Sequence, residues 1–436
     1  MDNRQHTAEH LTDSRISPLF LLLFFGGIRM KNRIERMLLP FSHKNAKKQG
    51  IDPDFPDLTD GFDRSLEAPG EGIPVISFCT EPLPAGTYAL HVTLKAIHDT
   101  GVVYLFAGRK QMHDRIALRE GEIYDRTFYL SVAEIIPRYH SHPYFVERVF
   151  FSVAASHPKD IVLCFGSVIP VDIPTVFLGG DSTVTDQPAE LPYHPGSCYA
   201  SWGQNLPYFI DQAAAVENQA RSGLTTETFR REGHYGNILH HMHSGDFCLF
   251  QFGHNDQKLI HLQADKDYQK NLIRYVEEVK ATDATPVLVT PLGRNIWNDD
   301  GTYNDLLKEH ADAVIRVAQK EDVEVIDLHR WSVEFIREHG LNASRGYYHP
   351  GDYTHTNDYG AYLFASYIAM RLKVIFPGVF HTAREGETLT PPNNLWEIMD
   401  QKNNRVDAPG EKESFDRMEK SVDDLLKAVK RAKIGT

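Results

Sequence analysis

The sequence has 436 residues, of which 42% are hydrophobic and 24% are charged, and its formal net charge is −13. A chain of this length exceeds one ordinary hydrophobic core, so we expect two or three domains. The acidic balance argues against nucleic acid as a partner, because proteins hold nucleic acid chiefly through Lys and Arg on its phosphates. The four cysteines are scattered, and their spacing indicates neither a zinc site nor a disulfide framework.

The first 55 residues predict a poorly ordered N-terminal segment. The apolar run at residues 19–25 is shorter than the ~18 residues that a membrane-spanning helix needs. It could be the core of a signal peptide, but acidic residues precede it and charges follow it in place of a small-residue cleavage site. We therefore expect a cytoplasmic protein without a membrane partner, with secretion as the alternative.

Residues 56–172 are typical of a β-sandwich, which would form an accessory domain. Short runs that alternate apolar with polar residues are separated by Gly and Pro turns, without a convincing helix. Several aromatic side chains in this region could stack on sugars, but we expect them to pack in the core. The expected strands span residues 75–78, 86–94, 102–106, 126–132, 147–153 and 160–165, and the aromatic residues are Tyr104, Tyr139, Tyr144 and Phe145.

Residues 175–400 alternate strands with helices, which predicts a parallel sheet covered by helices on both faces. A last amphipathic helix is expected at residues 411–434, docked on the body of the protein or on a second copy of the chain. The expected strands span residues 175–178, 216–219, 246–252, 286–290 and 324–327, and two of the expected helices span residues 268–280 and 303–319.

The first of these strands runs into Gly179-Gly180-Asp181-Ser182-Thr183. The glycines allow a sharp turn, and the polar residues after them offer cap chemistry for a following helix. Ser182 would then lie at the carboxyl end of a parallel strand, where open α/β sheets bind ligands, with its N–H directed at a bound anion. The alternative is that Ser182 is only a helix cap.

Polar, glycine-containing motifs also follow later strands, and in a doubly wound sheet such strand ends converge on one crevice. The motifs are Asn218–Gly223, Gln251–Asp256 and Gly351–Asp358. They supply the parts of a serine hydrolase. His355 can take the proton of the Ser182 hydroxyl, and Asp352 can hold the imidazole in the required tautomer. The N–H groups of Ser182 and Gly223 and the amide of Asn255 can form an oxyanion hole, in which one donor is typically worth ~3 kcal/mol.

These motifs resemble the SGNH (GDSL) hydrolases, and residues 218–233 and 251–257 look most like rhamnogalacturonan acetylesterases. The resemblance covers about residues 175–371. It implies a three-layer αβα domain with a five-stranded parallel sheet, serine esterase chemistry without a metal or other cofactor, and acetylated pectin as the substrate. Leu224 stands where the family often has a basic residue, a departure that concerns the sugar contacts and not the chemistry.

Carried over by motif match, the nucleophile is Ser182, the acid and base are Asp352 and His355, and the oxyanion donors are Ser182, Gly223 and Asn255. The expected partner is therefore an acetylated oligosaccharide or polysaccharide, and the expected reaction is removal of its O-acetyl groups through an acetyl-enzyme. Two alternatives remain open. One is an esterase, lipase or thioesterase acting on another acyl ester, and the other is an inactive sugar-binding protein.

Two further residues follow the fourth expected strand on the same edge of the sheet. Arg294 could pair with the carboxylate of a uronic acid, and Trp297 could stack on a sugar ring. The alternative interpretation is a surface salt bridge beside a packed indole.

The histidines suggest a metal site in two places, one formed by His349, Asp352 and His355 and the other by residues 240–243. Neither has HExxH-type geometry, and the second run lies on an expected helix that would direct its side chains to different faces. We therefore expect no metal, and we expect His254 to support the oxyanion loop.

Overall fold

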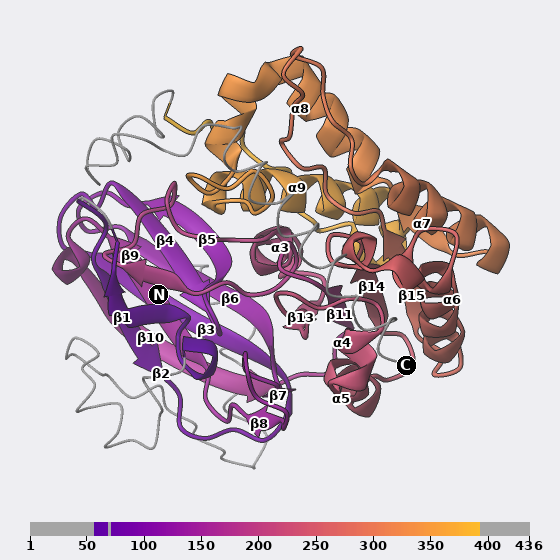
Figure 1. Cartoon of the computed structure of the whole chain (residues 1–436). Helices are drawn as coiled ribbons and strands as arrows, with labels where there is room; N and C mark the ends of the chain where they lie inside the picture. Colours follow the sequence, from indigo (N-terminus) through magenta and orange to yellow (C-terminus); the bar gives the residue numbers. More distant parts are fainter. Residues whose placement is uncertain (1–55, 69–70, 393–436) are drawn as a thin grey trace, which may run out of the picture. The chain divides into compact units, whose positions relative to one another are not determined.

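The computed structural model describes residues 56–68 and 71–392 (Figure 1). The predictions for residues 1–55 and for a helix at 411–434 lie outside the described residues. All described residues fall within one compact unit. None of its helices in the described ranges is both long and apolar enough to cross a membrane.

The predicted parallel sheet is present, with five strands in the order β13-β11-β14-β15-β16. Every neighbouring pair in this sheet is parallel, and each strand differs from its predicted bounds by only one or two residues. The strands are β11 (Thr175–Gly180), β13 (Ala215–Asn218), β14 (Phe247–Gln251), β15 (Thr285–Val289) and β16 (Glu324–Ile326).

Helices cover both faces of this sheet, because alternate strand residues point to opposite sides. Val176 and Leu178 pack with α3, α9 and α10, whereas Phe177 packs with α5, α6 and α7. The α/β part therefore has the three-layer αβα architecture. The helices are α3 (Trp202–Ile210), α4 (Thr228–Arg231), α5 (His234–His241), α6 (Asp267–Lys280), α7 (Lys308–Glu321), α8 (Leu328–Ser344), α9 (Asp358–Ile375) and α10 (Pro377–Phe380).

The structure corrects two predictions about helices. No helix follows Ser182: residues 181–185 form a single turn, in which the N–H groups of Val184 and Thr185 donate to the carbonyl of Asp181. The run of β-branched residues 183–185 disfavours a longer helix. The helix predicted to begin at residue 303 begins at Lys308, because Tyr303 pairs with Trp297 in an isolated β-bridge.

The β-rich region contains two antiparallel sheets, in the orders β10-β3-β6 and β2-β9-β4-β5. Their facing residues form one core, as in a sandwich. A two-stranded hairpin, β7 with β8, lies outside both sheets. The strands are β2 (Val75–Cys79), β3 (Gly86–Ala96), β4 (Val102–Ala107), β5 (Gln111–Ala117), β6 (Ile123–Val132), β7 (Glu134–Ile135), β8 (Tyr144–Phe145), β9 (Phe150–Ala155) and β10 (Ile161–Pro170).

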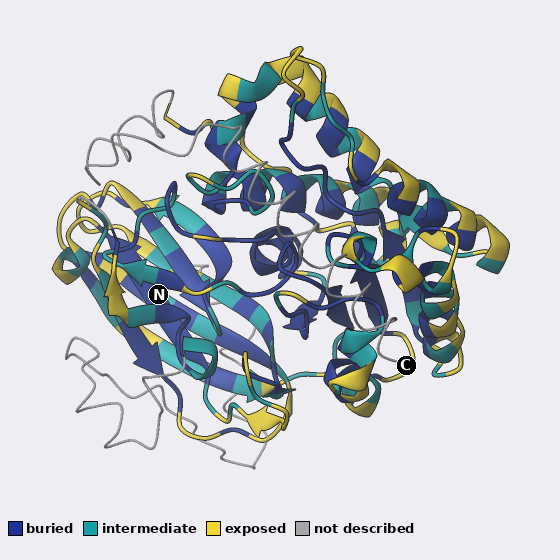
Figure 2. Cartoon of the chain, in the orientation of Figure 1, coloured by how far each residue is buried: buried dark blue, intermediate teal, exposed yellow. Residues whose placement is uncertain are grey.

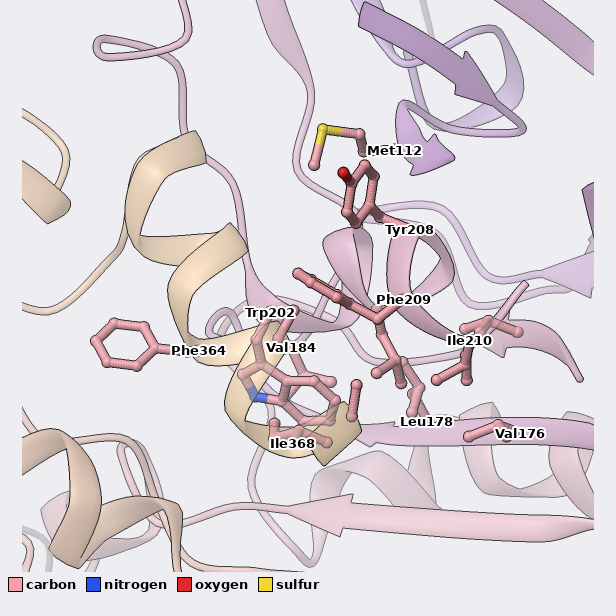
Figure 3. Packing of buried hydrophobic residues seen from close by; sticks show 14 of the residues in the cluster. Met112, Val176, Leu178, Val184, Trp202, Tyr208, Phe209, Ile210, Phe364 and Ile368 are labelled. Carbon is pink, nitrogen blue, oxygen red and sulfur yellow. The ribbon is translucent and has the colours of Figure 1, made fainter. Parts of the chain in front are cut away.

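The four-stranded sheet of this region also packs through its outer face onto the α/β part. Phe106 of β4, Met112 of β5 and Ala154 of β9 belong to the same buried cluster as Trp202 and Phe209 of α3 (Figure 3). Strand β9 is buried along its whole length, as are β11, β13 and β14 (Figure 2). In addition, β1 (Phe62–Glu67) pairs in parallel with β12 (Ala189–Leu191), which follows the first strand of the parallel sheet.

The prediction that the aromatic residues pack in the core is wrong for three of the four. Tyr139 is 91% exposed, and Tyr144 and Phe145 are 42% and 41% exposed. Tyr144 and Phe145 form β8, which is only two residues long and pairs with β7 alone, outside both sheets. Tyr104 does pack, with its ring centroid 5.6 Å from that of Tyr193.

Candidate active site

The loop after β11 holds Ser182 in a closely packed turn. A Cβ atom at Gly180 would lie 2.6 Å from a methyl carbon of Val184 and 2.8 Å from the carbonyl oxygen of Gln251. Glycine is therefore required at position 180 by close approach. The N–H and the hydroxyl of Thr183 both donate to Oδ1 of the fully buried Asp181, at 2.9 Å each. These contacts fix the backbone on either side of Ser182.

Three side chains predicted to act together form a continuous hydrogen-bonded chain. The hydroxyl oxygen of Ser182 lies 2.7 Å from Nε2 of His355, and Nδ1 of His355 lies 2.6 Å from Oδ2 of Asp352. Ser182 lies in the loop after β11, whereas His355 and Asp352 lie in the loop before α9. The structure thus brings together residues separated by more than 160 positions in the sequence.

The surroundings of Asp352 keep it ionised. Burial alone would raise its pKa, but hydrogen bonds from the His355 ring and from the N–H groups of Thr354 and His355 outweigh burial and lower the pKa to about 2. An ionised carboxylate on Nδ1 holds the proton of His355 on that nitrogen, so Nε2 is left as an acceptor for the Ser182 hydroxyl.

Two predicted oxyanion donors lie in loops that touch each other. Gly223 has a φ of +88°, and a Cβ atom placed there would meet nothing within 4 Å. The positive φ therefore explains the glycine, and the space in front of it is open. The Asn255 amide nitrogen donates to the carbonyl of Leu224 at 3.0 Å, and its oxygen accepts from Lys258 at 3.0 Å. One N–H of the Asn255 amide is left over from these contacts.

Arg294 has a different place from the one expected for a substrate-binding residue. Its side chain is only 5% exposed, and its guanidinium donates to the hydroxyl of Thr354 and to the carbonyl of His254, both at 3.0 Å. His254 in turn lies 3.4 Å from Asp181 and 2.9 Å from the carbonyl of Leu292. Arg294 and His254 therefore link the loop of Ser182, the loop of Asn255 and the loop that carries Asp352 and His355.

Trp297 likewise packs within the protein. Its indole N–H donates to the side chain of Asn295 at 2.8 Å, and its ring lies edge-on to Tyr303 at 5.6 Å. It joins a small cluster around Ile336 and Tyr348. The interpretation as a packed indole fits these contacts better than the interpretation as an open sugar platform.

The comparison with known proteins agrees with this geometry. The sequence matches the family model described as GDSL-like lipase/acylhydrolase over residues 179–362. That range includes Ser182, Gly223, Asn255, Asp352 and His355. This part of the chain is similar to the GDSL-like lipase/acylhydrolase family.

Two proteins of Bacillus subtilis are similar to part of this chain. The chain is 37% identical over 154 residues to rhamnogalacturonan acetylesterase RhgT of Bacillus subtilis, which covers 35% of this chain and 64% of the relative. It is 31% identical over 208 residues to the uncharacterized esterase YxiM of Bacillus subtilis, which covers 47% of this chain and 53% of the relative. The chain thus spans less than two thirds of either relative. The crystal structure of YxiM aligns with a TM-score of 0.44 at 24% identity, covering 69% of this chain and 80% of that one.

The candidate active site has an aromatic neighbour that sequence reasoning missed. The ring of Tyr199 stacks on His349 with a centroid distance of 3.6 Å, and it meets the ring of His355 edge-on at 5.8 Å. Burial, then the charge of Asp352 and a hydrogen bond to it, raise the pKa of Tyr199 to about 12. Tyr199 therefore stays protonated and supports both members of the His355–Asp352 pair. It stands outside every strand-end motif, so the sequence held no signal for it.

The β-rich region also reaches the candidate active site, through the turn between β4 and β5. The fully buried Lys110 donates to the carbonyl of Tyr199 at 3.1 Å and pairs with Asp358 at 3.3 Å. Arg109 pairs with Asp186 at 3.2 Å, four residues after Ser182. Both cations of the turn therefore hold loops that flank the hydrogen-bonded chain.

Proposed function

We propose that this protein is a serine esterase that removes O-acetyl groups from rhamnogalacturonan-type pectic carbohydrate through an acetyl-enzyme. The observation that carries the proposal is the chain of contacts from Ser182 through His355 to Asp352. The proposed substrate class is supported by the likeness to a relative named as a rhamnogalacturonan acetylesterase. Acetylation makes a neutral ester on a sugar hydroxyl, which a hydroxyl nucleophile can attack without a metal ion.

In the proposed reaction, Nε2 of His355 takes the proton of the Ser182 hydroxyl while its oxygen attacks the acetyl carbonyl carbon. The N–H groups of Ser182 and Gly223 and the free N–H of Asn255 donate to the resulting oxyanion. The intermediate collapses as His355 returns the proton to the sugar oxygen. Water, deprotonated by His355, then attacks the acetyl-enzyme, and acetate leaves as Ser182 regains its proton. Asp352 stays ionised and stabilises the charged imidazole throughout.

Hydrolysis of p-nitrophenyl acetate by the wild type and by Ser182→Ala tests the chemistry. The proposal expects at least a thousandfold loss in kcat for the variant, since related nucleophile deletions cost about 10⁶. Ser65→Ala serves as the matched control, because Ser65 is exposed on β1 and its hydroxyl contacts Asp63 and none of the site residues. Equal rates in the wild type and Ser182→Ala would remove Ser182 from the mechanism.

The substrate class needs a separate assay. Acetate release is measured from acetylated rhamnogalacturonan oligosaccharides and from acetylated xylan oligosaccharides, and p-nitrophenol release is measured from p-nitrophenyl octanoate. The proposal expects the highest kcat/KM on the first substrate. A higher kcat/KM on the octanoate ester would favour a lipase, and absence of turnover with tight sugar binding would favour an inactive sugar-binding protein.

A further inference from the structure

A second cluster of ligand-type side chains lies where the β7–β8 hairpin meets the end of α5. Glu134 of β7 and His240 and His241 of α5 each offer one ligand atom, and these three atoms lie within 4.8 Å of one another. None of the three belongs to the site described above. His240 is exposed, and Glu134 and His241 are partly buried. An incoming ion could therefore reach the cluster from solvent.

This cluster differs from what the sequence suggested for the histidine run. Adjacent residues in a continuous helix point to different faces, and that argument spoke against a metal site at residues 240–243. Helix α5 ends at His241, however, and the rings of His240 and His241 lie 5.2 Å apart. The third ligand comes from a strand more than 100 positions earlier in the chain, which a helix pattern cannot reveal.

The contacts of His241 prepare one of its nitrogens for a ligand. Its Nδ1 lies 3.0 Å from Oε1 of Glu217, a side chain only 6% exposed. The Glu217 carboxylate also accepts from Gln219 and from Ser131 at 2.9 Å each, so it is held in place. A carboxylate on one ring nitrogen fixes the tautomer and leaves the other nitrogen as a lone-pair donor, as in the second shell of metal-bound histidines.

The spacing across the cluster also suits an ion. Nε2 of His241 lies 3.7 Å from Oε2 of Glu134, which is longer than a hydrogen bond. Two ligands at ~2.1 Å from a tetrahedral ion are separated by about 3.4 Å. A simple ion pair would account for the approach of His241 to Glu134, but it would not involve His240. Two imidazoles and a carboxylate suit zinc and similar transition metals better than magnesium or calcium, which prefer oxygen ligands.

We propose that Glu134, His240 and His241 bind a divalent transition-metal ion of the zinc class, with water in the remaining position. Gln219 donates to the carbonyl of Glu134 at 2.7 Å, so the hairpin that carries one ligand also contacts the segment that leads to Gly223. The proposed ion has a structural role, because it holds β7 against α5.

The test titrates Zn²⁺ into the chelator-treated full-length protein, with calorimetry for affinity and thermal unfolding for stability. We expect one saturable site whose occupation raises Tm. His240→Ala and Glu134→Gln are expected to abolish saturable binding, and Glu217→Gln to weaken it about 10–100-fold. Co²⁺ in place of Zn²⁺ should give the visible absorption of a tetrahedral site, and that absorption should be absent in His240→Ala.

Two controls make the result specific. His243→Ala removes a neighbouring histidine whose side chain is 84% exposed, and it should bind Zn²⁺ like the wild type. His355→Ala removes the histidine of the candidate active site and should also bind like the wild type. Binding that survives in His240→Ala, binding that is lost in His355→Ala, or no saturable binding to the wild type would each overturn the proposal. His240→Ala, His243→Ala and His355→Ala replace solvent-accessible side chains, and thermal unfolding without metal reports whether each of these variants is folded.

Discussion

Lys110 of the β4–β5 turn donates to the backbone carbonyl of Tyr199, whose ring lies edge-on against His355. The β-rich region thereby supports the loop beside the proposed base. We expect Lys110→Met to lower the free energy of unfolding by about 3–5 kcal/mol, because it leaves the buried Asp358 without its cation and with only the Tyr193 hydroxyl as a side-chain donor. It should also lower kcat/KM on p-nitrophenyl acetate, since the loop at Tyr199 loses its anchor.

The double variant Lys110→Met/Asp358→Asn is the matched control for this prediction. Removing both charges should recover part of the lost stability, while the loss in kcat/KM remains because Tyr199 still lacks its donor. Denaturant unfolding and steady-state kinetics measure the two effects separately. Wild-type kcat/KM in the single variant would show that Lys110 has no part in holding the site.

Tyr199 should act through its ring more than through its hydroxyl. Tyr199→Phe removes the hydrogen bond to Asp352, for which we expect a loss of about fivefold in kcat, or ~1 kcal/mol. Tyr199→Ala also removes the surface against which His355 and His349 pack, so its loss should be larger. Kinetics of both variants on one neutral ester decide the point. A larger loss in kcat for Tyr199→Phe than for Tyr199→Ala would contradict this ranking.

Asp352→Asn tests the orientation of the imidazole. An amide in place of the carboxylate can donate to Nδ1, which favours the wrong tautomer of His355, and a loss of about 10⁴-fold in kcat is expected. The variant should fold normally, because the amide oxygen can still accept from the N–H groups of Thr354 and His355. Near-UV circular dichroism checks the fold. A loss below tenfold would argue that Asp352 does not orient the base.

Arg294→Lys separates positioning from substrate binding. Lysine keeps the charge but cannot reach both the Thr354 hydroxyl and the His254 carbonyl, which the guanidinium contacts together. We expect a lower kcat on neutral p-nitrophenyl acetate and on acidic oligosaccharides alike. If the effect were instead a raised KM confined to substrates that carry uronic acids, Arg294 would have to contact the sugar.

The pH dependence of stability should report His349. Burial lowers its pKa to about 4, with His355 acting in the same direction against Asp352, whereas an unfolded histidine titrates near ~6.5. The unfolded state therefore binds more protons in between, so the contribution of His349 is fully present above ~6.5 and is lost as the pH falls toward about 4.

Denaturant unfolding from pH 7 to 4 measures this effect in the wild type and in His349→Phe, which keeps a ring for Tyr199. The curve of the variant should fall less steeply in that window. It should not become flat, because burial lowers the pKa of His234 to about 4 as well. Identical slopes for the two proteins would contradict the prediction.

The parts of the site that follow strand ends could be predicted from the sequence. A buried parallel strand is a continuous apolar run, and glycine with a polar residue directly after it marks the edge where ligands bind. The loop of His355 follows α8 and not a strand, so it was identified from its residue types and from the resemblance to the SGNH hydrolases. The strand-end signal located Ser182 and Asn255. Their proximity followed from topology, because parallel strands end at the same edge.

The supporting contacts could not be predicted in this way, because they join residues without a shared periodic pattern. Strand β5 was missed because polar residues such as His113 and Asp114 are buried in it, and one partner of Asp114, Arg384, lies 270 positions away in the sequence. The burial of Arg294 was missed for the same reason. Its position at a strand end was visible, but the carbonyl and hydroxyl that face it were not.

The pairing of β1 with β12 has a consequence for any attempt to divide this protein. One strand comes before the sandwich and the other comes after the nucleophile loop, so a cut near residue 173 would separate hydrogen-bonded partners. Such a cut would also uncover Trp202 and Phe209 where Phe106 and Met112 now cover them. The α/β part is therefore poorly suited to transplantation as a free-standing unit, and shuffling between homologues should exchange both parts together.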